Sequence, residues 1–484
     1  MLHLGYAAAR GAPAGSLELA DEEGAAHSLG GRQGAVRGRP DGARIQPTGG
    51  VRSGWLRLWA SPWSMALLWA MAVLVVVGGA LRQMHLPYSG GDIHYFYARV
   101  HDLLAGRDPY AATVAHPYDA KTGDFGDIFL YSPAFYLLLS PLTLLQPAAA
   151  WAVWAAFDGL CLLLGPVCFV KAMAPRLSAR VGLLIAMALS VTSMARFELY
   201  FGNADVVLLL LLAAAFLAAR RGRGVLAGVL LGLSAIVYLQ ALPFLLFYLW
   251  KRAYRTAITG TLLFVAVSAG AFLLTSASTF ASFGVLAQRF IGPWASIYIN
   301  QSLYAVALRL FTPTPYSAQP LAHLPWLPPL VWLASVTGAL LVAGRAISRQ
   351  RLAATPETRS GLELALALSA LIVFFPVLEA NTLVIAGVLV AAVAIAVASH
   401  MRERSWRWLG SGLVLVYALA CLSMTGWESQ RLGALRGLRG SHFVTAAFTS
   451  VPYLYLAAML CVLVYGALWL HDRTGHAALK GRIA

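Results

Sequence analysis

The stretch WSMALLWAMAVLVVVGGAL, residues 63–81, decides the fold class, because it contains no charged side chain. An α-helix rises about 1.5 Å per residue, so a run of this length matches the hydrocarbon core of a bilayer, which is about 30 Å thick. Arg52 and Arg57 precede the run. Because basic residues concentrate on the cytoplasmic side, we expect the N-terminus inside and residue 83 outside.

Similar apolar runs recur as far as residue 470. They lie at about 128–146, 148–170, 181–197, 204–219, 224–250, 256–276, 326–346, 361–378, 382–399, 405–424 and 449–470. Only 12% of the 484 residues are charged, whereas soluble domains have about 25%. The sequence therefore predicts an all-α polytopic integral membrane protein with 11–13 transmembrane helices. It excludes a soluble enzyme with one anchor, and also an outer-membrane barrel, whose strands would alternate over about ten residues.

Two of the runs are irregular. The run 224–250 is too long for one straight crossing, and we expect two short helices that meet near Tyr238–Pro243. That division places Arg220–Arg223 and Lys251–Arg255 on the same cytoplasmic face. The run 128–146 contains Ser-Pro pairs at residues 132–133 and 140–141, which break helices, so it is either a span or a re-entrant pair.

The net charge of +16 does not indicate nucleic-acid binding, because Arg and Lys form short clusters between the apolar runs. Residues 1–50 lack apolar periodicity and are predicted to be a disordered cytoplasmic tail. A transmembrane domain follows at 51–475, and residues 476–484 form a cytoplasmic C-terminal tail. No CxxC pair is present, so neither a zinc site nor a disulfide framework is expected. Only four of the 36 basic residues are Lys, which is typical of a bacterial chain of high-GC coding.

Two long polar loops are expected on the extracytoplasmic side, at about 83–127 and 277–325. The first loop holds six of the chain's twenty acidic residues. Within it, Ile93–Leu104 has apolar residues at helical spacing and predicts an interfacial helix on the membrane plane.

Gly90-Gly91-Asp92 is the first candidate for chemistry. The two glycines allow a tight turn, so Asp92 stands at or near the start of the interfacial helix. One interpretation is a helix N-cap, which Asp fills well. The other is a general base at the boundary between the outer leaflet and water, where a lipid phosphate would be found.

Several weak elements follow Gly-Gly-Asp in a characteristic order. They are Gly106-Arg107-Asp108-Pro109-Tyr110, the Y-x-P element at 131–133, the L-Y-x-G-N-x-D element at 199–205, the A-G-x-L-L-G-L-S-A stretch at 227–235 and N-x-S-L at 300–303. This order resembles that of glycosyltransferase family 87, polyprenol-phosphate-mannose-dependent mannosyltransferases of the GT-C fold. The resemblance covers about residues 88–400.

The resemblance implies an inverting glycosyltransferase of the bacterial inner membrane that acts on the periplasmic side. Its donor is a polyprenyl-phosphate sugar, with mannose as the expected hexose, and its acceptor is a hydroxyl of a lipid or glycan. An acid in the first outside loop acts as base in such enzymes, and Asp92 matches that position. No cofactor is expected, no metal-ligand spacing is seen, and membrane lipids are the other expected partners.

Further residues are expected to bind the donor or the acceptor. His94 and Arg196 are candidates to stabilise the departing phosphate, together with His101, Arg289 and His323. Tyr95, Tyr110 and Tyr131 could stack on sugar. Glu198 and Asp205 flank Tyr200–Asn203 and either line the site or make interhelical hydrogen bonds. The remaining candidates come from the ordered motifs: Asn203, Tyr238, Asn300 and Ser302.

The chain departs from the family pattern at two places. Many members have a Lys-Pro pair after the A-G-x-L-L-G-L stretch, whereas this chain has Tyr238 and Leu239. Members often read S-P-x-S-W with a following His near a late span. Here the residues are Phe375 to Asn381, and Glu379 and Asn381 could supply that function.

Two other classes stay open at the level of sequence. A polysaccharide ligase or polymerase would use a polyprenyl-pyrophosphate donor and an Arg/His pair in a late outside loop, and loop 277–325 contains Arg289, Arg309 and His323. A lipid or solute transporter is compatible with many spans and buried acids, but the chain shows no internal repeat of the kind that many transporters have.

Overall fold

The computed structural model describes residues 61–86, 89–115, 131–177, 179–296, 300–314, 320–379, 381–422 and 451–483. No strand runs through these segments, and their regular structure is helical, which confirms the all-α fold class. The expected tail at 1–50 and the basic stretch around 425–448 lie outside the described residues. The last helix continues to Ile483 and so includes most of the expected C-terminal tail at 476–484.

The first half of the chain forms the helices of the first expected outside loop and the first apolar spans. Its helices are α2 (Pro62–Gln83), α3 (Gly91–Leu104), α4 (Ala111–Ala115), α5 (Pro133–Leu138), η1 (Ser140–Leu144), α6 (Pro147–Met173), α7 (Ala179–Ser190), α8 (Ser193–Phe201), α9 (Asp205–Arg220), α10 (Gly224–Val237), η2 (Leu239–Ala241) and α11 (Pro243–Trp250). The helix α3 confirms the expected helix at Ile93–Leu104. The run 128–146 is not a span, since its Ser-Pro pairs begin the two short helices α5 and η1.

The second half contains the remaining spans and a second group of outside helices. Its helices are α12 (Tyr254–Leu274), α13 (Ala277–Ile291), η3 (Pro293–Ser296), α14 (Leu303–Phe311), α15 (Leu327–Ala346), η4 (Leu352–Ala354), α16 (Glu357–Phe374), η5 (Asn381–Ala386), α17 (Gly387–Ser399), α18 (Arg404–Cys421) and α21 (Pro452–Ile483). Much of the expected loop 277–325 is therefore helical.

The long run 224–250 breaks where the sequence predicts. The helix α10 ends at Val237, and Pro243 begins α11, with η2 between them. Arg220 and Lys251 flank this broken pair, and both bond Leu352. The Arg220 guanidinium donates to the carbonyl of Leu352, and the N–H of Leu352 donates to the carbonyl of Lys251. The two basic clusters therefore lie on the same side, as expected.

Among the described residues, six stretches are long and apolar enough to cross a membrane alone, and the bent pair α7–α8 makes up to seven. The six are α2, α6, α12, α15, Thr382–Ser399 and Pro452–Thr474. The protein is therefore a multi-pass membrane protein. The sequence count of 11–13 is higher because it includes runs that fold as shorter helices, such as α10 and α11, whose freed backbone groups must then be satisfied inside the protein.

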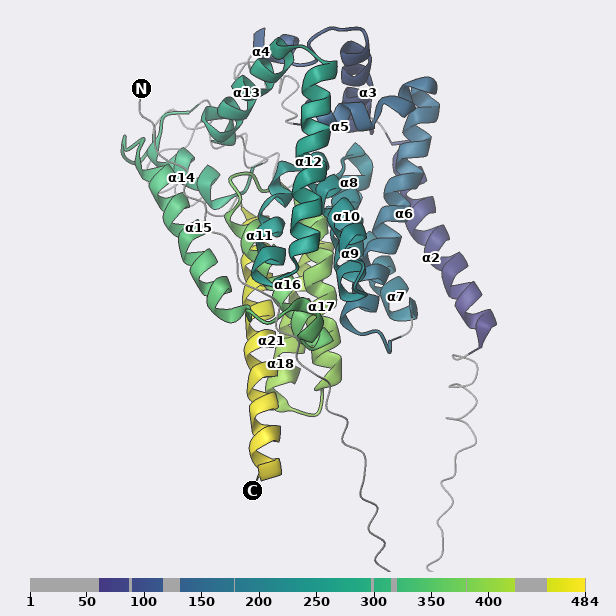
Figure 1. Cartoon of the computed structure of the whole chain (residues 1–484), viewed down its shortest axis with the longest axis vertical. Helices are drawn as coiled ribbons and strands as arrows, with labels where there is room; N and C mark the ends of the chain where they lie inside the picture. Colours follow the sequence, from purple (N-terminus) through teal and green to yellow (C-terminus); the bar gives the residue numbers. More distant parts are fainter. Residues whose placement is uncertain are drawn as a thin grey trace, which may run out of the picture. The chain divides into compact units, whose positions relative to one another are not determined.

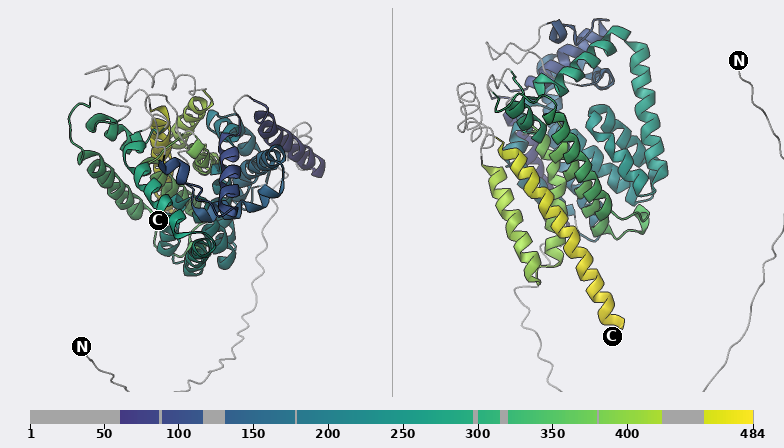
Figure 2. Two further views of the ribbon diagram at one scale, coloured as in Figure 1. Left: turned by 90° about the horizontal axis from the view of Figure 1, so that it is seen from above. Right: turned by 90° about the vertical axis from the view of Figure 1, so that its left-hand side faces the viewer.

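The spans form two groups that meet beside the outside helices. In the first group, α6 packs against α2, α7 and α9, and α10 packs against α9 and α12. In the second group, α21 packs against α16, α17 and α18, and Figure 2 shows α18 and α21 side by side. The short helix η5 of the second group contacts α8 and α9 of the first. The carboxylates described below lie near this contact.

The two expected outside loops contact each other at one end of the helices, where α3, α4, α5 and α13 gather (Figure 1). The Ser282 hydroxyl of α13 donates to Asp108 Oδ2 at 2.5 Å, and Arg289 Nη1 donates to the carbonyl of Val114 at 2.9 Å. Through its bond to Val114, Arg289 holds α13 against the first of these loops.

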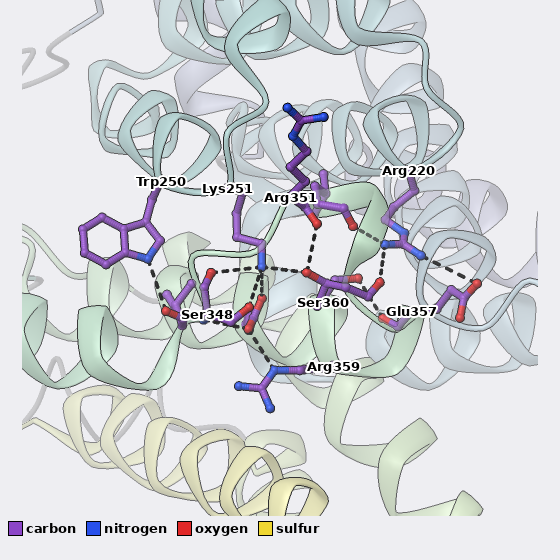
Figure 3. A network of polar contacts seen from close by, with 12 residues as sticks. Arg220, Trp250, Lys251, Ser348, Arg351, Glu357, Arg359 and Ser360 are labelled. Atoms are coloured by element: carbon purple, nitrogen blue, oxygen red, sulfur yellow. Dashed lines mark hydrogen bonds and ion pairs between the residues drawn. The ribbon is translucent and has the colours of Figure 1, made fainter. Parts of the chain in front are cut away.

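The opposite end is held by a buried lysine (Figure 3). Lys251 Nζ donates to Glu363 Oε2 at 2.6 Å, to Thr355 Oγ1 at 2.9 Å and to Ser348 Oγ at 3.0 Å. Glu363 Oε1 accepts from Arg359 Nε at 3.1 Å, and Arg359 also pairs with Asp472 of α21. Both partners of the Lys251–Glu363 pair are fully buried. The network therefore joins α11, the segment after α15, α16 and α21.

We expect Lys251→Met to lower the Tm of the purified protein, because it leaves Glu363 buried with one counter-ion fewer. Removal of one partner of a buried pair costs about 3–5 kcal/mol. The double variant Lys251→Met with Glu363→Leu should recover part of this loss, since no unpaired carboxylate remains. Thermal unfolding in detergent measures the effect, with the exposed Arg402→Met as the control. An unchanged Tm in Lys251→Met would contradict this assignment.

Candidate active site

A left-handed turn at Gly90 brings Asp92 against the spans. Gly90 has φ +73°, and its N–H donates to the carbonyl of Tyr200 at 2.7 Å. A Cβ at this position would lie 2.9 Å from the indole of Trp151, so only glycine fits. The turn therefore anchors the start of α3 on the last turn of α8.

A second glycine turn lies on the same indole. The helix α8 ends at Gly202, with φ +67°, and a Cβ there would lie 2.5 Å from the Trp151 ring. The carbonyl of Gly202 accepts from Trp154 Nε1 at 2.8 Å. Both turns thus pack on α6, and this common support brings together the first turns of α3 and α9, which carry Asp92 and Asp205.

Asp92 lies in the first turn of α3 and is only 3% exposed. The N-cap is Gly90, which makes no side-chain cap, so Asp92 is not the N-cap that one interpretation of the sequence proposed. Burial raises the pKa of Asp92 well above its usual range, and the charges of Glu379 and Asp205 raise it further. The position in the first turn favours a negative charge, because the helix dipole is positive there.

Three more carboxylates lie around Asp92. Glu198 and Asp205 are buried in α8 and α9, and Glu198 Oε1 accepts from the N–H of Val206 at 3.1 Å. Glu379 lies in the segment between α16 and η5, and loss of solvent raises its pKa to about 7. Within the described part of the chain, no salt bridge joins Asp92, Glu198 or Glu379 to a basic side chain. The described residues therefore bring several acids together without an ion pair to these three.

Two predicted tyrosines and Asn203 form one hydrogen-bonded cluster beside these acids. Asn203 Oδ1 accepts from the hydroxyl of Tyr238 at 2.7 Å, from the N–H of Ala204 at 2.7 Å, and from the hydroxyl of Tyr131. The two tyrosine hydroxyls lie 2.5 Å apart. The hydroxyl of Tyr110 donates to the carbonyl of Tyr131 at 2.6 Å. The cluster therefore joins the first outside loop to the break between α10 and α11.

The other predicted binding residues are placed differently. His94 is exposed on α3, with its Nδ1 2.7 Å from the carbonyl of Gly90. Tyr95 is buried, and the guanidinium of Arg99 lies over its ring. Arg196 is exposed on α8. Asn381 begins η5, and its side chain lies outside the described part of the structure.

Asn300 and Ser302 are fully buried and bond backbone groups rather than facing an opening. Asn300 Nδ2 donates to the carbonyl of Pro376 at 2.9 Å, and Ser302 Oγ donates to the same carbonyl at 2.6 Å. The structure thus brings both residues next to the segment that carries Glu379, not next to Asp92 itself.

The sequence analysis did not single out Trp151 and Trp154 as parts of the site. They are three residues apart and therefore share one face of α6. Aromatic residues in apolar runs are usually membrane-interface belts, so spacing alone did not mark them. Their proximity to Gly90 and Gly202 becomes visible only when α3 and α8 are packed on α6.

A small apolar cavity of ≈ 10 Å³ lies between α9, η2, α11, α16 and η5, and Leu208, Gln240, Phe375 and Thr382 are among the residues that line it. Phe375 and Thr382 flank the segment that carries Glu379. The surroundings of Glu379 on this side are therefore apolar and closely packed.

These observations define a multi-pass membrane protein with a cluster of largely buried carboxylates toward the end where α3, α4, α5 and α13 gather. Residues 129–374, just over half of the chain, match glycosyltransferase family 87. The chain belongs to this family and is a glycosyltransferase. Asp92 precedes the matched residues and Glu379 follows them. A search of the curated proteins finds no match.

The raised pKa of Asp92 predicts how its removal changes stability with pH. An acid whose pKa is raised on folding stabilises the folded state below its unfolded pKa of about 3.9, and this contribution is lost as pH rises through the folded pKa. Asp92→Asn should therefore raise the Tm increasingly between pH 5 and pH 8.5. Thermal unfolding of both proteins across this range measures the difference. A Tm difference that shrinks with rising pH would contradict the burial of an ionisable Asp92.

Proposed function

We propose that the protein transfers a hexose, with mannose the first candidate, from a polyprenyl-phosphate donor to a hydroxyl of a lipid or glycan acceptor. The reaction takes place on the extracytoplasmic face of the bacterial inner membrane, in a domain of the GT-C fold. Membership of glycosyltransferase family 87 supports the transferase over a transporter. The observation that carries the mechanism is the position of Asp92, a buried carboxylate held by two glycine turns beside Glu379 and Asp205.

In this mechanism Asp92 is the general base. The acceptor oxygen attacks the anomeric carbon of the sugar while its proton passes to the Asp92 carboxylate. The bond between the anomeric carbon and the phosphate oxygen breaks on the opposite side, so the configuration inverts, and polyprenyl phosphate leaves with the bonding electrons. A phosphate is a good leaving group and needs charge stabilisation more than a proton.

The donor has an anionic phosphate and an apolar chain, and the described residues suggest a place for each. His94 lies on the exposed side of α3, one turn from Gly90, and its Nδ1 donates to the carbonyl of Gly90; in the imidazolium form its Nε2–H is a second donor, which we assign to a phosphate oxygen. Arg196, exposed on α8, is the second candidate. We assign the isoprenoid chain to the apolar surface beside Phe375 and Thr382. We assign Tyr131, Asn203 and Tyr238 to hydroxyls of the sugar or acceptor, because their polar atoms converge on one point.

The assignment of Asp92 is tested by Asp92→Asn, which we expect to lower kcat/KM by about 10²–10⁴-fold, the contribution of a general base. Purified protein is incubated with labelled polyprenyl-phosphate mannose, glucose or arabinose and a lipid extract, and the labelled product is identified by mass spectrometry. The matched control is Asp102→Asn on the same helix, where the carboxylate is paired with Arg107. Full activity of Asp92→Asn would remove Asp92 as base, and wild-type protein that transfers from none of these donors would overturn the proposed donor class.

Glu379 should influence the pH dependence of the reaction. Its charge raises the pKa of Asp92, and a base must be deprotonated to act, so wild-type kcat/KM should rise with pH towards neutrality. Glu379→Gln removes that charge, lowers the pKa of Asp92 and moves the acid limb of the profile to lower pH. Glu357→Gln, at the opposite end of the chain's helices, is the control. An acid limb that stays in place or moves to higher pH would contradict an electrostatic effect of Glu379 on Asp92.

A further inference from the structure

Residues 300–302 and 376–378 run side by side and are joined through their backbones. The N–H of Gln301 donates to the carbonyl of Leu378 at 2.7 Å. The N–H of Leu378 in turn donates to Asn300 Oδ1 at 2.9 Å. Both backbone polar groups of Leu378 are therefore held by this segment, and Glu379 is the next residue in the chain.

The Asn300 side chain makes all the hydrogen bonds that an amide commonly makes. Its Nδ2 donates to the carbonyls of Ala295 at 2.8 Å and Pro376 at 2.9 Å. Its Oδ1 accepts from the N–H of Ser302 at 3.0 Å in addition to that of Leu378. An amide has two donors and two acceptor positions, so no capacity is left for a substrate.

Neighbouring side chains hold the same segment from other elements. Ser302 Oγ donates to Pro376 and also caps α14 by accepting from Ala305 at 3.1 Å. Arg309 Nη2 donates to the carbonyl of Asn300 at 2.8 Å. Gln301 Oε1 accepts from the N–H of Tyr453, the second residue of α21, at 2.9 Å. Contacts with α14 and α21 thus fix the segment 300–302, and this segment in turn holds the segment 376–378.

The segment 375–379 needs such support because it is not helical. The helix α16 ends at Phe374, and η5 begins only at Asn381. Backbone groups without helical partners must be satisfied by other parts of the protein when water is absent. Asn300 and Ser302 supply these partners at Pro376 and Leu378, which leaves Glu379 at a defined place.

We propose that Asn300 is a positioning residue for the transfer reaction: with Ser302 it holds the backbone at 376–378 so that the Glu379 carboxylate stands beside Asp92. This inference rests on the proposed function in so far as Asp92 is the base. Neither Asn300 nor Ser302 touches substrate, and both act through Glu379.

A double-mutant cycle on the pH profile of transfer is the first test. Asn300→Ala should move the acid limb of the kcat/KM profile to lower pH, in the direction of Glu379→Gln. In the Glu379→Gln background the same change should move the limb much less, because the group that it positions is already absent. Full additivity of the two shifts would overturn the proposal.

Ser302 provides a second pair of variants for the case in which Asn300→Ala does not fold. Ser302→Ala loses the donor to Pro376 and should shift the pH profile in the same direction, whereas Ser302→Thr keeps the hydroxyl and should restore it. The matched control is Ser335→Ala, which removes a hydroxyl donor to the carbonyl of Val331 within α15. A pH profile that is unchanged in Ser302→Ala would contradict the positioning role.

A measurement that needs no transfer separates this inference from the proposed function. In full-length protein whose four cysteines are replaced by alanine, Glu379→Cys is labelled with a hydrophilic maleimide. Adding Asn300→Ala should raise the labelling rate about tenfold or more, since the loss of several buried hydrogen bonds releases the segment. Ser335→Ala should leave the rate unchanged. An unchanged rate in Asn300→Ala overturns the inference even if wild-type activity is found, and a raised rate supports it even if the proposed donor is wrong.

Discussion

The structure depends on one constraint: in an apolar environment, every interruption of a helix must be satisfied by another part of the chain. The break between α10 and α11 shows how this is done. Lys251, just after α11, is fully buried and still has a carboxylate, two hydroxyls and a carbonyl around its ammonium group. A buried ion pair is costly unless its remaining hydrogen bonds are satisfied. Here they are satisfied, and the network fixes the end opposite to the candidate site (Figure 3).

The carboxylates at the other end do not follow the same rule. Glu198 Oε2 is buried and has no hydrogen-bond partner among the described residues, and Asp92 has two acids as its closest charges. Such a group destabilises the fold, so its retention needs a reason beyond stability. A base that operates near neutral pH gains from a raised pKa. The contrast between the paired network around Lys251 and the buried Glu198 oxygen that lacks a partner among the described residues therefore matches the proposed division between anchoring and chemistry.

Local signals in the sequence were sufficient for most of the helices. Pro133, Pro141 and Pro243 begin short helices where proline was expected to interrupt apolar runs, and the apolar spacing at Ile93–Leu104 corresponds to α3. Contacts between distant residues could not be predicted in this way. Lys251 and Glu363 are 112 positions apart, and Asn300 and Pro376 are 76 positions apart. In the sequence, Asn300 was a candidate because it is part of a motif. Only its contacts in the structure reveal that it holds the backbone at Pro376 and Leu378.

The role of Tyr238 is likewise visible only from its contacts with residues distant in the sequence. The family pattern that the sequence resembles has a lysine at this point, and the sequence alone shows only that the positive charge is absent. In the structure the Tyr238 hydroxyl joins Tyr131 and Asn203 in a neutral cluster. A lysine here could offset part of the negative charge of Asp205, which acts on Tyr238 and on Asp92. Under the proposed function, a tyrosine at this point leaves the donor phosphate to other polar side chains, for which His94 and Arg196 are the proposed candidates.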